Sequence, residues 1–268
     1  HITNLERDKS YNKNTKITYP VRKDEIGALS YDIKSMSNDL KRRINEIEEF
    51  ATDVSHELKN PLSGLKSSID LLYSNKIEER NKYLLIKNMS EDIDRMNILI
   101  SDISNYTLTQ VEISEEILEI VEINSFFQEF NKSLSNKKVH LEIKNSQDII
   151  NLKINKNMFI QVLHNLLDNS LSYIKDNSKV LISITTNNSK CIIHFVDQGP
   201  GISFEYRNKI FERFYTDREE KKKSHTGIGL SISKNIIQSF GGEIRLIKNT
   251  YLDFKGACFE IVLPLKGW

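Results

Sequence analysis

The chain has 268 residues, of which 38% are apolar and 28% charged, with a formal net charge of +1. This composition fits a soluble protein of one large domain or two ordinary ones, and the near-zero charge gives no electrostatic case for nucleic acid binding. No apolar run of about 18 residues, the length that spans a bilayer, is present, and we find no signal peptide. Because the chain opens on His1 with residues typical of the middle of a protein, we expect a fragment whose N-terminal neighbour is missing.

A long helix is predicted from Asp24 onward, after polar residues 1–20 that show little periodicity. Apolar residues recur there in steps of three and four, which is typical of a coiled-coil seam. A step of four is repeated at Leu40–Ile44 and at Leu58–Leu62. Such insertions locally unwind a supercoil, so we interpret both as candidate signalling points.

His56 occupies an unusual position in this helix. It follows the seam position Val54 by two residues, about 200° around the helix, and therefore points outward. Glu57 is adjacent, and Asn60 lies one turn further on the same face. Pro61 removes a backbone donor, so we expect it to interrupt or bend the helix beside His56. This layout is typical of a surface imidazole that is modified, and not of a core histidine.

A second helix with a regular apolar stripe follows a short turn at Ser74–Lys76, which predicts an antiparallel hairpin. A single hairpin would leave its stripe half exposed to water. Two hairpins paired into a four-helix bundle would bury the stripe, so we expect a homodimer. The alternative is packing of the hairpin onto the C-terminal part of the same chain.

After about Gln110 the period changes, and the pattern predicts an α/β sandwich with one mixed sheet covered by helices on one face. Cys191 and Cys258 match no metal or redox spacing and fall in apolar strands, so we expect buried free thiols. The fold class is therefore α+β and multidomain: a dimeric four-helix bundle followed by the sandwich. We expect strands at 118–123, 139–143, 149–153, 180–186, 191–197, 243–247 and 258–263, and helices at 125–135 (capped by Asn124 or Ser125), 155–173 and 228–240.

Two polar clusters in this second domain suit a nucleotide. Asn165 and Asn169 lie one turn apart on one helix face, where amides could donate to phosphate and offer oxygen to Mg²⁺. Asp197 ends an apolar strand and is followed by Gly199 and Gly201, which allow a tight turn and close approach of a ligand. The Asp197 carboxylate could accept a hydrogen bond from an amine such as N6 of adenine.

A third cluster, Thr226–Leu230 with Gly227 and Gly229, opens a helix. Glycines at a helix N-terminus expose backbone N–H groups and the positive end of the helix dipole to anions. The pattern is neither a Rossmann fingerprint nor a Walker loop. Each cluster alone has an ordinary structural explanation, but their order and spacing together predict a nucleotide site.

With these motifs, residues 20–268 resemble a bacterial sensor histidine kinase of the two-component type. His56 matches the H box of that family, Asp24–Leu29 resembles the second half of a HAMP linker, and Arg42–Leu65 is similar to alphaproteobacterial envelope-stress or acid-sensing kinases. The remaining matches are Asn165 and Asn169 (N box), Asp197–Gly201 and Thr226–Leu230 (glycine boxes), Ile210–Tyr215 (F box), and 240–244, 256–257 and 263–264 (end of the ATP-binding domain).

The resemblance implies a partial HAMP linker at 1–43, a dimerisation and histidine phosphotransfer domain at 44–112, and a GHKL-type (Bergerat) ATP-binding domain at 113–268. It implies that ATP with Mg²⁺ phosphorylates His56, and that the phosphoryl group passes to an aspartate of a cognate response regulator. Dephosphorylation of that regulator is implied too. The chain would then be the cytoplasmic portion of a bacterial inner-membrane protein, with the membrane reached only through the missing N-terminal segment.

The resemblance also assigns roles to single residues. Glu57 would orient or deprotonate the His56 imidazole, and Asn60 would position water for dephosphorylating the partner. Residues 216–225 would be a mobile lid over the nucleotide. In the ATP site, Asp197 would accept the adenine amine and Tyr173 would pack on the ring. Asn165 and Asn169 would hold Mg²⁺ and phosphates, and Arg213 would reach the γ-phosphate. The motifs would be completed by Gly199, Gly201, Gly227, Gly229 and Leu230.

Two positions depart from the family pattern and bear on ATP affinity. Ser172 stands where many relatives have a phosphate-facing lysine, and His225 takes the first position of the usual Gly-x-Gly-x-Gly. Two alternatives remain: a GHKL ATPase, whose relatives carry a glutamate at the position of Asn165, and a non-catalytic dimeric signalling scaffold. His56, the two asparagines and Asp197 favour the kinase. For the other histidines, His140, His164 and His194, we expect structural or surface roles.

Overall fold

The computed structural model describes residues 24–73, 78–115, 117–134, 140–145, 149–174, 178–187, 189–216 and 226–265. It divides into two compact units, His1–Asp53 and Val54–Trp268, which are described separately. The predicted turn at Ser74–Lys76, most of the predicted lid and the start of the HAMP remnant lie outside the described residues.

The helix α1 (Glu25–Tyr73) supplies the whole described part of the first unit. It begins after Asp24, whose Oδ1 accepts the backbone N–H of Gly27 at 3.1 Å. The seam is open to solvent in the single chain, which leaves an apolar stripe that a second helix could cover. Its residues in this unit, which are between 45% and 67% exposed, are Ile26, Leu29, Ile33, Met36, Leu40, Ile44 and Ile47.

The interruption predicted at Pro61 is wrong, because α1 continues through this residue to Tyr73. Pro61 is buried, and burial of its ring offsets the single backbone hydrogen bond that it removes. A bend of the helix at this point stays a prediction.

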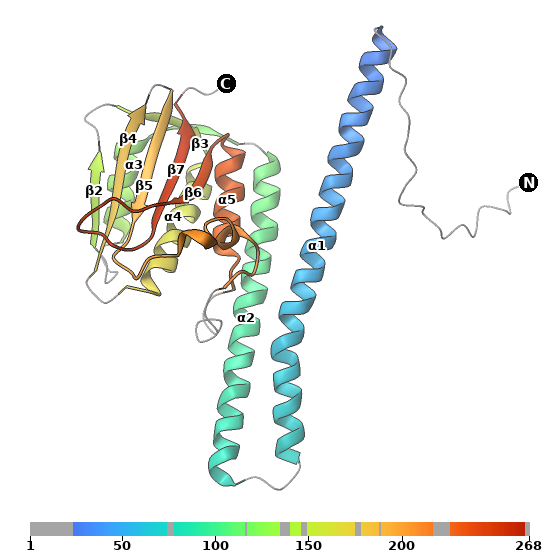
Figure 1. Ribbon diagram of the computed structural model, residues 1–268. Coiled ribbons are helices and arrows are strands. Elements are labelled where there is room, and N and C mark those ends of the chain that lie inside the picture. The colour runs from blue at the N-terminus through green and yellow to red at the C-terminus, as the bar shows by residue number, and fades with distance from the viewer. Residues whose placement is uncertain are drawn as a thin grey trace, which may run out of the picture. The chain divides into compact units, whose positions relative to one another are not determined.

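In the second unit, α1 from Val54 onward runs beside α2 (Glu79–Glu115), which forms the predicted hairpin (Figure 1). Two contacts join these helices. Arg95 of α2 donates to Glu57 of α1 at 3.2 Å, and a Cβ added to Gly64 would lie 2.7 Å from Oδ2 of Asp92. The carboxylate of Asp92 therefore lies close against Gly64.

A mixed five-stranded sheet forms the centre of the C-terminal part, with strand order β2-β4-β5-β7-β6. The pair β2–β4 is parallel, and the other neighbours are antiparallel. The prediction of a single sheet is wrong for two strands, since β1 and β3 pair only with each other as an antiparallel ribbon. The strands are β1 (Glu119–Glu122), β2 (His140–Asn145), β3 (Asn151–Ile154), β4 (Lys179–Asn187), β5 (Lys190–Val196), β6 (Glu243–Ile247) and β7 (Cys258–Pro264).

Helices α3 (Ile123–Ser133), α4 (Lys156–Leu171) and α5 (Gly229–Ser239) cover one face of this sheet (Figure 1). Alternate strand residues such as Ile182, Ile193 and Phe259 are buried beneath them, as the two-residue period requires. Two short 3₁₀ turns, η1 (Phe204–Tyr206) and η2 (Lys209–Phe211), lie between β5 and α5.

The predicted cap of α3 is wrong. The carboxylate of Glu122, two to three residues earlier than expected, accepts the backbone N–H groups of Asn124 and Ser125 at 2.9 and 2.7 Å. A carboxylate at this position also complements the positive end of the helix dipole. For α4, Asn155 caps the helix through the N–H of Met158.

Both cysteines are free and buried, as predicted. Burial raises the pKa of each thiol to about 12, so neither carries a thiolate near neutral pH. Within the described ranges, no helix is long and apolar enough to cross a membrane.

Candidate nucleotide and phospho-acceptor sites

A cavity of about 600 Å³ in the second unit brings together members of all three predicted clusters. The three clusters are spread over the 66 residues from Asn165 to Leu230, and the helix–sheet packing places them around one space. Gly199 and Arg213 are not among the residues that line it. Of the predicted residues, those that line it are Asn165, Asn169, Tyr173, Asp197, Gly201, Gly227, Gly229 and Leu230.

Asp197 is the most buried polar residue of the cavity wall, with 6% of its surface exposed. It follows directly after β5, and its Oδ1 accepts the backbone N–H groups of Gly199 and Ala257 at 2.8 and 3.0 Å. Its Oδ2 accepts the hydroxyl of Ser170 at 3.1 Å. Burial raises the pKa of Asp197, although these three hydrogen bonds act in the opposite direction. The carboxylate is thus held rigidly at the cavity wall.

The backbone around Gly256 tightens this arrangement. Its N–H donates to the carbonyl of Asp197 at 3.0 Å, and a Cβ placed here would come within 1.8 Å of Oδ1 of Asp197. Only a glycine leaves room for the carboxylate in this position. Sequence analysis placed Gly256 in the family pattern but did not connect it with Asp197, and it missed Ser170.

Asn165 is oriented by the third cluster. Its Nδ2 donates to the carbonyl of Gly229 at 3.0 Å and to the hydroxyl of Ser233 at 3.3 Å. Both amide hydrogens then have partners on α5, which makes Oδ1 the atom of this side chain that can serve a cation. The N box and the second glycine box are therefore joined through Asn165.

The glycine turn before α5 packs on the F box. Gly227 has φ of +76°, and Phe214, which donates its N–H to the Gly227 carbonyl at 3.1 Å, also has a positive φ of 61°. A Cβ on Gly227 would lie 2.7 Å from backbone atoms of Phe214 and Tyr215. Neither the left-handed backbone nor the space admits a side chain at this position.

Helix α2 also contributes to the cavity, which sequence analysis did not anticipate. Ile98, Asp102 and Asn105 line it, and the hydroxyl of Thr226 donates to the carboxylate of Asp102. The pairing joins residues 124 positions apart, and no local pattern signals such a contact.

Arg213 lies outside the cavity lining, and its Nη1 donates to the hydroxyl of Tyr106 on α2 at 3.3 Å. Its predicted contact with the γ-phosphate stays a prediction. Ser172, which replaces the lysine of many relatives, donates its hydroxyl to the carbonyl of Asp168 at 2.8 Å. His225 lies outside the described residues.

His56 is exposed on α1, as its helical phase predicts, and Asn60 is exposed one turn later. Glu57 is partly buried, with its carboxylate paired to Arg95. Arg95 was not singled out from the sequence, because the hairpin contact depends on how the two helices pack. Among the other histidines, the ring of His164 packs edge-on against that of Phe130, with 5.3 Å between the ring centroids.

Two protein families match this chain, one over the region of His56 and one over the region of the cavity. Residues 46–109 match the family described as the His Kinase A (phospho-acceptor) domain, which includes His56. Residues 154–267 match the family of histidine kinase-, DNA gyrase B- and HSP90-like ATPases, which includes the whole cavity wall outside α2. The chain therefore combines the two domains that define a sensor histidine kinase.

The chain belongs to the sensor histidine kinase family. It is 34% identical over 266 residues to the sensor protein ChvG of Agrobacterium fabrum, which is 92% of this chain and 44% of that protein. It is 35% identical over 263 residues to ChvG of Rhizobium meliloti, again with 44% of that protein covered. The alphaproteobacterial likeness predicted from Arg42–Leu65 is confirmed. The chain spans less than half the length of these relatives.

Two solved structures share the fold. The histidine kinase ThkA, in complex with the response regulator protein TrrA, superposes with a TM-score of 0.55 at 21% identity, over 84% of this chain and 64% of that one. The Acinetobacter baumannii histidine kinase AdeS superposes with a TM-score of 0.52 at 21% identity, over 79% of this chain and 98% of that one. The predicted order, a helical hairpin followed by a GHKL-type α/β domain, is confirmed.

Proposed function

We propose that this chain transfers the γ-phosphoryl group of ATP to His56 and then to an aspartate of a response regulator. One observation carries the proposal: a single chain joins an exposed histidine in a phospho-acceptor domain to a cavity with a buried carboxylate and oriented amides. In this proposal residues 44–112 form the dimerisation and phosphotransfer domain and 113–268 the ATP-binding domain, after a partial HAMP linker at 1–43.

The chemical step is a displacement at phosphorus. A ring nitrogen of His56 attacks the γ-phosphorus, the bond to the β–γ bridging oxygen breaks, and ADP leaves. The imidazole must be free of a proton on the attacking nitrogen, a state that the neighbouring Glu57 would favour by accepting the other N–H. Asn60, exposed on the same helix, would position water when the regulator is dephosphorylated.

ATP binding would use the cavity wall as follows. Asp197 accepts the adenine amine, Tyr173 packs against the base, and the glycines of the second glycine box present backbone N–H groups to the phosphates. Mg²⁺ would be held by the amide oxygens of Asn165 and Asn169 and would neutralise phosphate charge. The oriented amide of Asn165 supports this assignment.

Two further parts of the proposal concern assembly. Exposed apolar residues of the hairpin, among them Leu62, Ile69, Ile93 and Ile100, support a homodimer in which two hairpins form a four-helix bundle. The partner that receives the phosphoryl group would be the receiver domain of a response regulator. We place the chain on the cytoplasmic side of a bacterial inner-membrane protein whose remaining length, present in its relatives, carries the sensor.

The test is incubation of the purified chain with ATP labelled at the γ-phosphate. We expect label on the protein that is stable in base and labile in acid, as a phosphohistidine is. His56→Gln should remove the label, whereas His164→Gln, a substitution outside the site, should retain it. Asp197→Asn should lower labelling at limiting ATP while His56 remains intact.

The same experiment separates the two alternatives. Release of free phosphate without labelled protein would identify a GHKL ATPase and contradict the kinase. Absence of nucleotide binding by the folded chain would favour a non-catalytic scaffold. Label that survives His56→Gln would show that another residue is the acceptor.

A further inference from the structure

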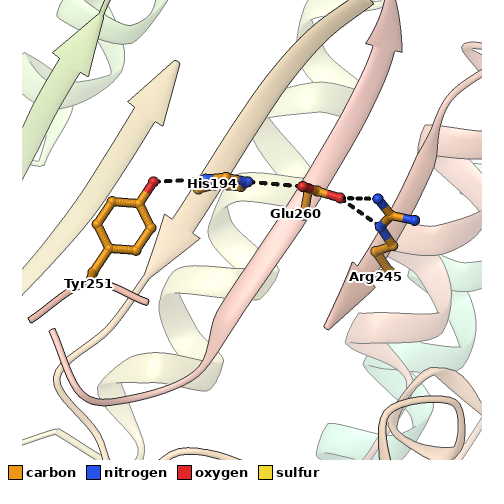
Figure 2. A network of polar contacts seen from close by, with 4 residues as sticks. All are labelled: His194, Arg245, Tyr251 and Glu260. Atoms are coloured by element: carbon orange, nitrogen blue, oxygen red, sulfur yellow. Dashed lines mark hydrogen bonds and ion pairs between the residues drawn. The ribbon is translucent and has the colours of Figure 1, made fainter. Parts of the chain in front are cut away.

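A chain of four polar side chains crosses the sheet face opposite the helices (Figure 2). The hydroxyl of Tyr251 lies 2.7 Å from Nδ1 of His194, Nε2 of His194 lies 3.0 Å from Oε2 of Glu260, and Oε1 of Glu260 accepts from Nε of Arg245 at 2.6 Å. His194 and Arg245 are both register partners of Glu260, from β5 and β6 on either side of β7. Tyr251 comes from the segment between β6 and β7.

The direction of each hydrogen bond follows from Glu260. Burial alone would raise the pKa of Glu260, but the hydrogen bonds from His194 and Arg245 outweigh it and hold that pKa below its ordinary value. A carboxylate only accepts, so Nε2 of His194 carries a proton and donates. In the neutral ring Nδ1 is then the acceptor, and Tyr251 donates its hydroxyl to it. With a neutral imidazole, each group in the chain therefore has one role as donor or acceptor.

Tyr251 is fixed to the segment 248–257 as well as to His194. Its backbone N–H donates to Oδ1 of Asn249 at 2.9 Å, and Nδ2 of Asn249 donates to the carbonyl of Gly256 at 2.8 Å. Phe254, between them, is buried in a cluster that Tyr251 packs against. Through Asn249, the position of Tyr251 is therefore linked to the position of the Gly256 backbone.

The backbone at Gly256 and Ala257 holds Asp197, whose carboxylate accepts the adenine amine in the proposed function. Gly256 donates its N–H to the carbonyl of Asp197, and Ala257 donates to Oδ1 of Asp197, both at 3.0 Å. Asp197 and Ala257 line the nucleotide cavity, while Tyr251 and His194 are not among its lining residues. An unbroken series of contacts thus leads from His194, on the outer face of the sheet, to Asp197 on the cavity wall.

We propose that the His194–Tyr251 hydrogen bond is a positioning contact for adenine recognition, which holds segment 248–257 where it fixes the Asp197 carboxylate. The inference rests on the proposed function, since it assumes that Asp197 accepts the adenine amine. It assigns to His194 and Tyr251 a role in base selection without contact with the nucleotide.

The test compares the dissociation constants of ATP and inosine triphosphate for the chain of residues 1–268. Inosine presents a carbonyl oxygen where adenine presents its amine, so the wild-type chain should bind ATP more tightly. Tyr251→Phe keeps the ring packing but removes the hydroxyl donor. We expect it to weaken ATP binding about three- to tenfold, the range of one net hydrogen bond, and to change inosine triphosphate binding by less than about twofold.

Three further variants make the test specific. His194→Leu removes the acceptor from the other side and should reproduce the ATP-specific loss, even if Tyr251→Phe fails to fold. His194→Asn retains an oxygen acceptor close to the position of Nδ1 and should restore most of the preference for ATP. Arg245→Gln breaks only the exposed end of the chain and should leave the preference unchanged.

Equal weakening for both nucleotides, or unchanged ATP binding in Tyr251→Phe and His194→Leu, would overturn the positioning role. Failure of the proposed function has a different signature. In that case the wild-type chain itself binds no ATP, or binds both nucleotides equally.

Discussion

Arg95 of α2 donates a hydrogen bond to the carboxylate of Glu57 at 3.2 Å, so the residue beside His56 is tied to the neighbouring helix. The two side chains are 22% and 26% exposed. An ion pair at this exposure contributes little to stability, about 0.2–1 kcal/mol, because water screens it. The chemical role proposed for Glu57 should therefore be separable from the ion pair.

The first prediction separates the chemical role of Glu57 from the ion pair. Glu57→Gln should lower the initial rate of His56 phosphorylation about 100-fold or more, because a positioned proton acceptor contributes at least that much. Arg95→Gln should change this rate less than about threefold and lower the free energy of unfolding by at most about 1 kcal/mol. Label incorporation at saturating ATP and urea denaturation measure the two effects. Equal rate losses in both variants would contradict the role of Glu57.

The second prediction concerns Asp197 and pH. Its pKa in the folded chain is raised by burial above the ordinary value of 3.8, so the protonated form is favoured on folding. This contribution to stability is fully present below pH 3.8 and is lost as pH rises through the folded-state pKa. Asp197→Asn lacks the titration, so wild type should lose stability relative to the variant over that rise.

Thermal unfolding of both proteins across this pH range checks the sign. The amide also suits the site, because its oxygen accepts from Gly199 and Ala257 while Ser170 can accept from its nitrogen. The variant should therefore fold but bind ATP at least about tenfold more weakly, the loss of a charge-assisted hydrogen bond. A parallel pH dependence in the two proteins would show that Asp197 does not titrate abnormally.

The third prediction contrasts two glycines of one motif. Gly227→Ala should destabilise the chain by about 1–3 kcal/mol, because the site combines a left-handed backbone with a clash against the F box. Gly229→Ala should cost less than about 1 kcal/mol, since the atoms nearest to the added methyl would be those of Asn165, at 3.6 Å and beyond, an ordinary contact. Urea denaturation of both variants measures the difference. Similar stabilities would mean that the turn at Gly227 readjusts freely.

Local patterns predicted most of the elements and the clusters of the site. Both long helices and the strand β6 follow from apolar periodicity, and Asp197 and Gly227 were recognisable because each motif lies in one short stretch. The cap at Glu122 was missed because the sequence also offered better-known cap residues, Asn124 and Ser125, two and three positions later. Which of several possible residues caps a helix depends on where the preceding strand ends. Here β1 ends at Glu122, and α3 begins at the next residue.

Contacts between distant segments could not be predicted. The pairing of β1 with β3 depends on which neighbours remain after the main sheet has formed, and the two strands are only four residues long. A structural or surface role was expected for His194, but its partners Tyr251 and Glu260, 57 and 66 residues away, could not be identified from the sequence. The position of Asp102 in the cavity wall could not be predicted either, because it follows from the packing of α2 beside α5.

The last prediction follows from that position of Asp102. Its carboxylate lines the cavity and accepts from Thr226, at the glycine turn that would receive the phosphates. A negative charge there opposes binding of a triphosphate, since two like charges a few ångströms apart repel by about 1–4 kcal/mol between the dielectric of water and that of a protein surface. Asp102→Asn should therefore bind ATP at least about fivefold more tightly, the factor that corresponds to about 1 kcal/mol, with a smaller gain at high salt.

Asp94→Asn, on an exposed position of the same helix, removes the same charge outside the cavity and should leave ATP affinity unchanged. Calorimetric titration of the three proteins at low and high ionic strength makes the comparison. Weaker ATP binding by Asp102→Asn would mean that the Thr226 contact assists the nucleotide site, for instance by holding the turn before α5 in place. Tighter binding with a gain that falls at high salt would show that the Asp102 charge opposes the nucleotide, and that α2 contributes to ATP affinity through this residue.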